Sequence, residues 1–443
     1  MKFDNQLRYA TTIIADYKGE MPLHTWLKTF FRDHPQMGSK DRRVVSNMVY
    51  GYYRLGHTMK GSTVSERILT GLFLCHDRPQ ELLQYFKPQW NERAALPLED
   101  KMTVCRQSGI GFDPLEIFPW KEELSEDIDH EAFCLSFLRQ PDLFLRIRPG
   151  CREAVLGKLA QPPGRLTQDP ADLSLSRAGS QDPAPYEFIP PSTLRLPNGF
   201  KVEDLFTPDK EVVVQDYSSQ RLGSFLQMPF PYLLVSKGAG LPKEVEGADH
   251  SPKEVPLSFW DACAASGGKS ILAFDLNPGL EITVSDIRES ILHNLHQRFR
   301  QAGIKNYHSF VANLVAGNAP VAGHKRIGGS QQARGPYDLI LADVPCSGSG
   351  TWSRTPEELY FFDPARIRSY QAAQIKIARH TVPALGPGAY FVYSTCSVFK
   401  KENEEIATFL RDEMQLQPDR IEYLKGYDQR ADSMFGARFR RPA

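Results

Sequence analysis

The chain lacks long hydrophobic runs, paired cysteine spacings and an excess of charge of either sign. No apolar stretch approaches the roughly 18 residues that cross a membrane, and the first residues show no signal-peptide pattern, so we expect a soluble, cytoplasmic protein. Seven cysteines at irregular positions favour reduced thiols over a disulfide framework, and we expect no bound metal. Lysine plus arginine and aspartate plus glutamate both total 53, so any basic surface for a nucleic-acid partner must be local.

The 443 residues are too many for one hydrophobic core, so two or three domains are expected. In residues 1–140, apolar side chains recur at helical spacing, as at Leu23 and Leu27, which predicts a helical domain. Between about 150 and 200, proline and glycine interrupt every pattern, which indicates a small subdomain or an irregular connector. From about residue 201 onward, apolar strands alternate with helical segments, a pattern typical of an α/β fold with a mostly parallel sheet.

Two cysteines, Cys346 and Cys396, each follow a short apolar run, at 339–342 and 390–393, that predicts a buried strand. The carboxyl ends of strands in an open α/β sheet meet at the crevice where such sheets bind ligands. Two thiols at that crevice indicate covalent chemistry on an electrophile. Four other cysteines are interpreted as small buried hydrophobic residues: Cys75, Cys105, Cys134 and Cys151.

A glycine turn at 261–270, with the sequence DACAASGGKS, follows one predicted strand and opens a predicted helix. This arrangement lets backbone N–H groups approach a nucleotide-like ligand. A Walker loop would need glycine where Cys263 stands, and no G-x-G-x-x-G sequence is present. The remaining interpretation is S-adenosylmethionine, with its methionine end against the small residues of the turn. The next predicted strand ends in Asp286, whose carboxylate can accept both ribose hydroxyls.

The segment 343–346, Asp-Val-Pro-Cys, stands where methyltransferases hold the target base. An Asp-Pro-Pro-aromatic sequence there would suit methylation of an exocyclic amine, but here the fourth residue is a thiol. Carbon 5 of a pyrimidine does not take a methyl group unaided. Addition of a thiolate to carbon 6 turns carbon 5 into an enamine-like nucleophile, so the thiol favours methylation at carbon 5.

Three segments together resemble the motif set of the Nop/Sun (Fmu-like) RNA cytosine-5 methyltransferases: 261–270, 343–350, and 394–397 (STCS) with 401–404 (KENE). The segment 214–220, VQDYSSQ, is similar to the opening of that family's catalytic domain.

The resemblance extends to the rest of the chain and implies a domain layout. Residues 1–140, which include KDRR at 40–43, resemble the all-α NusB-like RNA-binding domain of bacterial ribosomal-RNA members. Residues 141–205 would form a small α+β linking subdomain, whose start at 143–148 resembles the family's. Residues 206–443 would form an α/β, Rossmann-like, SAM-dependent methyltransferase domain.

The family's functional residues carry over onto matching positions. Cys396 resembles the nucleophile that attacks carbon 6, and Cys346 the second cysteine that is needed to release the product. Asp343 would hydrogen-bond the cytosine edge and stabilise charge on the ring, while Lys269 keeps the site electropositive and favours thiolate. Asp286 would hold the cofactor ribose. The expected contacts to the methionine portion come from Cys263, Ala264, Ala265, Ser266, Gly267, Gly268 and Lys269.

The chain departs from the family pattern at several positions. Ser266 replaces a usual proline, Ser270 a threonine, and the sequence at 432–435 replaces Asp-Gly-Phe-Phe. Asn313, which with Asp343 completes the expected cofactor contacts, occupies a strand end where an acid commonly meets adenine. The segment 315–335, rich in glycine and alanine, predicts a surface loop.

The resemblance implies an enzyme that uses S-adenosylmethionine to form 5-methylcytosine in RNA, with 16S ribosomal RNA as the expected substrate. Because the target base must leave its stack, single-stranded or loop RNA is the expected local structure. A tRNA cytosine-5 methyltransferase is an alternative, since the catalytic motifs do not encode the substrate. Another is a non-catalytic RNA-binding factor in ribosome assembly, against which the intact cysteine pair argues. We expect a monomer that binds no membrane and no metal.

Overall fold

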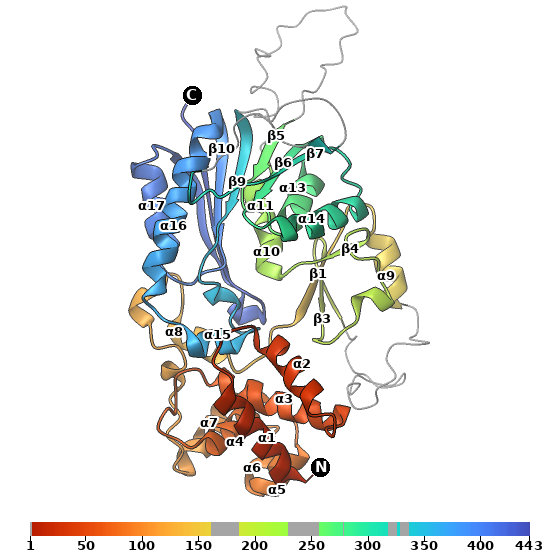
Figure 1. The fold of residues 1–443 in the computed structure, drawn as a ribbon, viewed down its shortest axis with the longest axis vertical. Coiled ribbons are helices and arrows are strands. Elements are labelled where there is room, and N and C mark those ends of the chain that lie inside the picture. The colour runs from red at the N-terminus through yellow and green to blue at the C-terminus, as the bar shows by residue number, and fades with distance from the viewer. Residues whose placement is uncertain (1, 161–185, 229–256, 278, 318–325, 328–335) are drawn as a thin grey trace, which may run out of the picture. The chain divides into compact units, whose positions relative to one another are not determined.

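The computed structural model describes residues 2–160, 186–228, 257–277, 279–317, 326–327 and 336–443 (Figure 1). Most of the predicted surface loop, at 318–325 and 328–335, lies outside these described residues. The chain forms two compact units. The first comprises Met1–Pro141, Gly348–Arg366 and Tyr427–Arg430, and the second comprises Asp142–Ser347, Ile367–Gly426 and Ala431–Ala443.

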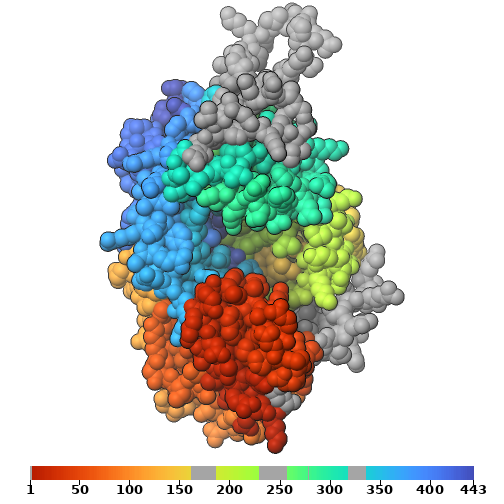
Figure 2. All heavy atoms as spheres, viewed as in Figure 1, coloured from red at the N-terminus to blue at the C-terminus, as the bar shows by residue number. Residues whose placement is uncertain are grey.

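The first unit is helical, as the apolar spacing predicted. Its main helices are α1 (Phe3–Asp16), α2 (Leu23–Asp33), α3 (Ser39–Arg54), α4 (Val64–Cys75), α5 (Glu81–Phe86), α6 (Pro88–Asn91), α7 (Leu98–Gln107), α8 (His130–Ser136) and α15 (Pro356–Phe361). The predicted core positions Leu23 and Leu27 are buried. In the space-filling view the N-terminal helices, coloured red to orange, form a closely packed body (Figure 2).

Close helix packing and an aromatic cluster hold the first unit together. A Cβ atom on Gly71 would lie 2.3 Å from the carbonyl oxygen of Gly51, so helices α3 and α4 can cross this closely only without side chains there. The ring of Tyr53 lies 5.8 Å from that of Phe361, and both pack near Tyr17 in edge-on or tilted arrangements. The segment Gly348–Arg366, from the C-terminal half of the sequence, is therefore part of this helical core.

The second unit contains a small antiparallel sheet with strand order β2-β3-β1-β4. Its elements are β1 (Leu143–Ile147), α9 (Arg152–Ala160), β2 (Glu187–Ile189), β3 (Thr193–Leu196) and β4 (Val212–Val214). Leu145, Val155 and Leu194 are fully buried in its core. Helix and strands together make this part α+β, and its strand β4 lies beyond residue 205, where the predicted linking subdomain ends.

A large sheet with strand order β11-β12-β10-β9-β5-β6-β7-β8 forms the rest of the second unit. Its strands are β5 (Ser258–Asp261), β6 (Glu281–Asp286), β7 (Tyr307–Val311), β8 (Arg326–Ile327), β9 (Tyr337–Asp343), β10 (Leu385–Thr395), β11 (Gln417–Leu424) and β12 (Met434–Arg440). Strands β7, β6, β5, β9 and β10 are parallel, while β8 and β12 pair antiparallel with their neighbours. The Rossmann-like α/β fold is confirmed.

Helices cover both faces of the large sheet (Figure 1). One face carries α10 (Tyr217–Arg221), α11 (Gly223–Leu226), α13 (Gly268–Leu276) and α14 (Glu289–Gln301), and the other carries α16 (Arg366–Thr381) and α17 (Glu404–Asp412). Burial on both faces explains why the central strand β9 has the near-continuous apolar sequence 339–342.

The order of the strands defines where a ligand can bind. The chain runs from β5 outward through β6 and β7, then returns to the other side of β5 as β9. Ligands in open α/β sheets bind outside the carboxyl ends of the strands at such a reversal. Those ends are marked by Asp261, Asp286, Asp343 and Thr395.

Candidate active site

The two cysteines singled out by their strand-end positions lie side by side. Strands β9 and β10 are neighbours, with Asp343 opposite Ser394 in the register. This pairing brings the sulfur atoms of Cys346 and Cys396 to 3.4 Å from each other. Both side chains are partly accessible, and neither forms a disulfide. The crevice therefore holds two adjacent thiols that a substrate can approach.

Glu402 ties together the two turns that carry these thiols, a role that the sequence analysis missed. Its carboxylate accepts a hydrogen bond from the backbone N–H of Ser347 (2.9 Å) and another from the hydroxyl of Ser397 (2.7 Å). Ser347 and Ser397 directly follow the two cysteines, and the Ser347 hydroxyl donates to that of Ser397 (3.1 Å). The Glu402 carboxylate also accepts from Gln374 Nε2 (3.0 Å). Burial raises the Glu402 pKa, although these hydrogen bonds oppose the shift.

The next residue, Asn403, fixes the Cys396 turn from behind. Its amide oxygen accepts from the Thr395 hydroxyl (2.6 Å), and its amide nitrogen donates to the carbonyl of Ser397 (3.0 Å). Asn403 is fully buried. Glu402 and Asn403 lie in the KENE segment, six and seven residues after Cys396. This short spacing was the sequence signal that could have indicated their role.

Lys269 and Asp343 form an ion pair at the same crevice. The Lys269 ammonium lies 2.7 Å from Asp343 Oδ2, and the Ser394 hydroxyl donates to Asp343 Oδ1 (2.7 Å). Burial by itself would lower the Lys269 pKa, but the Asp343 charge and hydrogen bond outweigh it, and Cys396 contributes, so that the pKa is raised. The Lys269 ammonium is therefore a fixed positive charge close to Cys396.

Asp261, at the end of β5, is a second acid that the sequence analysis quoted without a role. It is 1% exposed, and the Ser270 hydroxyl donates to its Oδ2 atom (2.6 Å). Burial, reinforced by the neighbouring Asp343 charge, raises the Asp261 pKa to about 7. Ser270 therefore supplies the hydroxyl that this acid needs, even though it replaces the family's threonine. An acid at the end of a buried strand was the signal available for Asp261.

The predicted cofactor turn has the tight geometry that its sequence indicated. Gly267 has a φ of +82°, and a Cβ atom there would lie 2.8 Å from Phe299, so only glycine fits. The backbone N–H of Ala265 donates to Asp286 Oδ2 (3.0 Å), and that of Arg288 donates to Asp286 Oδ1 (2.9 Å). Arg288 Nε also donates to Asp286 Oδ1 (3.2 Å). Each carboxylate oxygen accepts about two hydrogen bonds, so Asp286 keeps acceptor capacity for one ribose hydroxyl, at Oδ2.

The structure also shows the contacts or environment of three further residues of the predicted cofactor region, Cys263, Ser266 and Asn313. Burial, with the charges of nearby carboxylates, raises the Cys263 pKa well above its usual value, so this thiol does not compete as a nucleophile. Arg298 donates to the backbone and side-chain oxygens of Ser266 (3.1 and 3.0 Å), a contact that no sequence pattern signalled. The Asn313 amide oxygen accepts from the N–H of Ala316 (3.0 Å), which leaves its amide nitrogen to face a base.

The predicted site residues thus form two neighbouring groups. Lys269, Asp343 and Ser394 make direct contacts beside the thiol pair, while the cofactor turn is bonded to Asp286 at the next strand end. Within the described residues, no group of histidine, cysteine and acidic side chains could hold a metal ion. No helix in the described part of the chain is long and apolar enough to cross a membrane.

Several known proteins are similar to this chain in sequence. Residues 251–436 match the family described as 16S rRNA methyltransferase RsmB/F. The chain is 28% identical over 225 residues to ribosomal RNA small subunit methyltransferase B of Enterobacter sp. (strain 638), an alignment that covers 50% of this chain and 44% of the relative. The enzyme with the same name from Salmonella paratyphi B is 32% identical over 152 residues, which cover 34% of this chain and 33% of the relative. The matched regions span less than half the length of these curated relatives.

Solved structures agree on the fold. The crystal structure of PH0851 superimposes with a TM-score of 0.58, covers 99% of both chains and is 16% identical in sequence. At this identity the likeness concerns the fold alone, whereas the family match covers the glycine turn, the two thiols and the KENE segment. Residues 251–436 are therefore similar to the RsmB/F family of methyltransferases, and their motifs resemble those of the Nop/Sun group.

Proposed function

We propose that this chain is an RNA methyltransferase that forms 5-methylcytosine, with 16S ribosomal RNA as its substrate. The observation that carries the proposal is the pair of thiols 3.4 Å apart, beside the Lys269–Asp343 ion pair. Two adjacent thiols allow one to add to the base and the other to assist its release. A non-catalytic RNA-binding factor would have no use for this arrangement.

The cofactor of this family is S-adenosylmethionine, and the residues present fit it. Gly267, with a φ of +82°, allows the tight turn whose backbone would meet the methionine portion. Asp286 retains acceptor capacity for the ribose, and Ile287, the next residue, is 55% exposed and offers an apolar surface to adenine. When bound, S-adenosylmethionine supplies an electrophilic methyl group.

The side chains of this chain perform the remaining steps. The Cys396 thiolate adds to carbon 6 of cytosine, which makes carbon 5 nucleophilic enough to form a bond to the methyl carbon. Asp343, fixed by Lys269 and Ser394, hydrogen-bonds the base edge and stabilises the charge that develops on the ring. Cys346, whose sulfur lies 3.4 Å from that of Cys396, acts as the base and accepts the carbon-5 proton. The electron pair of that C–H bond forms the double bond between carbons 5 and 6 as the carbon–sulfur bond breaks, which restores the aromatic ring and the Cys396 thiolate.

Incubation with labelled S-adenosylmethionine, first with 16S ribosomal RNA and then with tRNA, tests the proposal. We expect label in 16S RNA, and mass spectrometry of the digested nucleosides should identify 5-methylcytidine. Label on adenine, label only in tRNA, or no label would contradict it.

Cysteine variants test the division of labour between the two thiols. Cys396→Ala should abolish turnover while S-adenosylmethionine still binds, and Cys346→Ala should accumulate a protein–RNA adduct visible on a denaturing gel. Cys75→Ala is the matched control, because burial raises the pKa of that thiol to about 11 and it lies outside the crevice. Loss of activity in Cys346→Ala without any adduct would contradict the assigned roles.

A further inference from the structure

The second unit contains a cavity that the reaction described above does not use. It has a volume of about 540 Å³ and lies between the small sheet and helices α10 and α13 of the methyltransferase sheet. Cavities of roughly 300–1,000 Å³ commonly hold small ligands or single groups of a larger one. Leu272, Asp275 and Leu276 line it from the last turns of α13. The first turn of this helix carries Lys269, roughly 9 Å away along the helix axis.

The lining of the cavity is strongly basic. Five arginines and two acids contribute to it: Arg146, Arg148, Arg152, Arg221, Arg420, Asp275 and Glu422. Positive charge therefore exceeds negative charge by three at this one place, although the whole chain is neutral. Arginine is the side chain best suited to phosphate, because its planar guanidinium offers paired donors.

Arg146, one of the arginines that line this cavity, has an unused hydrogen-bond donor. Its side chain is 95% buried, with Nε donating to Gln215 (2.9 Å) and Nη1 donating to Asp275 (2.6 Å). Its Nη2 atom is buried and has no hydrogen-bond partner. Buried polar groups are nearly always paired, so a residue that lines the cavity holds one unmet hydrogen-bond donor.

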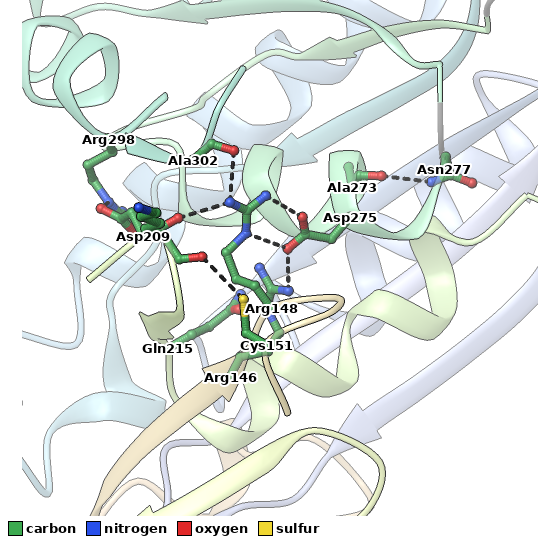
Figure 3. A network of polar contacts seen from close by, with 11 residues as sticks. Arg146, Arg148, Cys151, Asp209, Gln215, Ala273, Asp275, Asn277, Arg298 and Ala302 are labelled. Atoms are coloured by element: carbon green, nitrogen blue, oxygen red, sulfur yellow. Dashed lines mark hydrogen bonds and ion pairs between the residues drawn. The ribbon is translucent and has the colours of Figure 1, made fainter. Parts of the chain in front are cut away.

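Arg146 is held rigidly by the network drawn in Figure 3. Asp275 accepts from Arg146 and also forms a two-pronged pair with Arg148, at 2.6 and 3.2 Å. Arg148 donates further to the carbonyl oxygens of Asp209 (3.0 Å) and Ala302 (2.8 Å). One carboxylate thus serves two guanidinium groups, which leaves a net positive charge fixed in position.

The opposite wall repeats this arrangement. Glu422 forms ion pairs with both Arg221 and Arg420, so one acid again serves two arginines. Arg152 is exposed, lies 4.8 Å over the ring of Phe188 and makes no ion pair with a described residue. The Tyr217 ring, which is stacked on Phe144 at 5.7 Å, also lines the cavity. Aromatic side chains are common stacking partners for unpaired bases.

We propose that this cavity binds a nucleotide of the substrate RNA that is not the target cytosine. The phosphate of this nucleotide is attracted by the charges of Arg146, Arg152 and Arg221, while its base lies against Tyr217. The proposal rests on the proposed function, since it assumes an RNA substrate. It explains how a chain without net charge grips RNA: the positive charge is concentrated in one preorganised cavity.

Single arginine variants test the proposal in binding experiments without S-adenosylmethionine. Arg152→Gln and Arg221→Gln should each weaken binding of a 16S RNA fragment by about tenfold. Each should also reduce the slope of log K against log salt by about 0.7 for every phosphate that the variant no longer neutralises. Affinity for S-adenosylmethionine should stay unchanged. Arg411→Gln is the matched control, because Arg411 is exposed on α17 and pairs with Asp412 outside the cavity.

Several outcomes would overturn the proposal. The proposal is wrong if Arg152→Gln and Arg221→Gln have the same RNA affinity and the same salt slope as Arg411→Gln. It is also wrong if wild-type protein binds inorganic phosphate or cytidine monophosphate tightly and these variants abolish that binding but leave RNA binding unchanged. The ligand of the cavity would then be a free anion. Cross-linking of 4-thiouridine-containing RNA should label the peptide that contains Tyr217, and an unlabelled peptide would contradict the stacking. Salt-dependent RNA binding by a wild-type protein that transfers no label would overturn the proposed function and leave the cavity proposal intact.

Discussion

At the scale of single residues, the position of the two thiols depends on Glu402. Glu402→Ala should lower kcat at least tenfold, because Ser347 N–H and Gln374 lose their buried acceptor at a cost of about 1–3 kcal/mol each. Glu402→Gln should recover most of the activity, since its amide can accept from Ser347 and donate to the Ser397 hydroxyl. The measurement is the yield of RNA adduct in a Cys346→Ala background. Equal adduct yields in the Ala and Gln variants would show that Glu402 does not position the thiols.

Asp261 makes stability depend on pH in a direction opposite to most acids. Its pKa of about 7 in the folded chain lies above the usual aspartate value of 3.8, so the folded state binds more protons than the unfolded state between these values. Stability from this group is therefore present below about pH 4 and is lost as the pH rises through about 7. The loss is on the order of a few kcal/mol.

Replacement of Asp261 isolates this effect. Asp261→Asn should be the less stable protein near pH 4.5 and gain relative to wild type by pH 8, because the amide never ionises. The urea midpoints of both proteins at the two pH values measure the difference. A difference that does not change between pH 4.5 and 8 would contradict the raised pKa.

At the scale of elements, the strands of the site were predictable and their cross-links were not. The apolar runs 339–342 and 390–393 lie in β9 and β10, because strands buried on both faces need continuous apolar sequence. The glycine turn and Asp286 followed from the same βα pattern. Arg298, however, contacts Asp209, which is 89 residues away in the sequence. Contacts between distant polar side chains leave no periodic signal, so no local pattern reveals them.

Arg298 connects α14 to the cofactor turn, and this connection is testable. It forms a two-pronged pair with Asp209 (2.9 and 2.8 Å) and donates to both oxygens of Ser266. Arg298→Gln should weaken binding of S-adenosylmethionine about tenfold by loosening the turn, with RNA affinity unchanged. Calorimetric titration measures both affinities. Arg300→Gln, an exposed arginine on the same helix, is the control, and equal affinities in the two variants would contradict a positioning role.

At the scale of the whole molecule, the sequence indicated a helical N-terminal part but not all of the segments that belong to it. Residues 348–366 and 427–430 belong to the first unit, although they follow the methyltransferase motifs in the sequence. Helical periodicity reports that a face is buried but not which core buries it. The short helix α15 therefore gave no sign that it packs with α3, where Tyr53 meets Tyr360 at a ring distance of 5.3 Å.

Because residues 348–366 belong to the first unit, we expect that residues 1–141 alone do not form a complete folding unit. Arg54 is 5% exposed, and its Nη1 donates to the carbonyls of Phe137 (2.8 Å) and Ser353 (3.0 Å). Without residues 348–366, a buried guanidinium loses an acceptor and Tyr53 loses two aromatic neighbours. Amide exchange in α3 should therefore be faster in the 1–141 fragment than in the full chain.

Adding the missing segment should reverse the effect. A fragment in which a flexible linker joins residues 1–141 to 348–366 should regain most of the protection of α3, because Ser353 and the α15 rings return. The same linker carrying a scrambled 348–366 sequence is the control. Full protection of α3 in the 1–141 fragment would show that residues 348–366 contribute nothing to this core. Recovery of α3 protection with the native segment but not with the scrambled one would show that these residues complete the N-terminal fold.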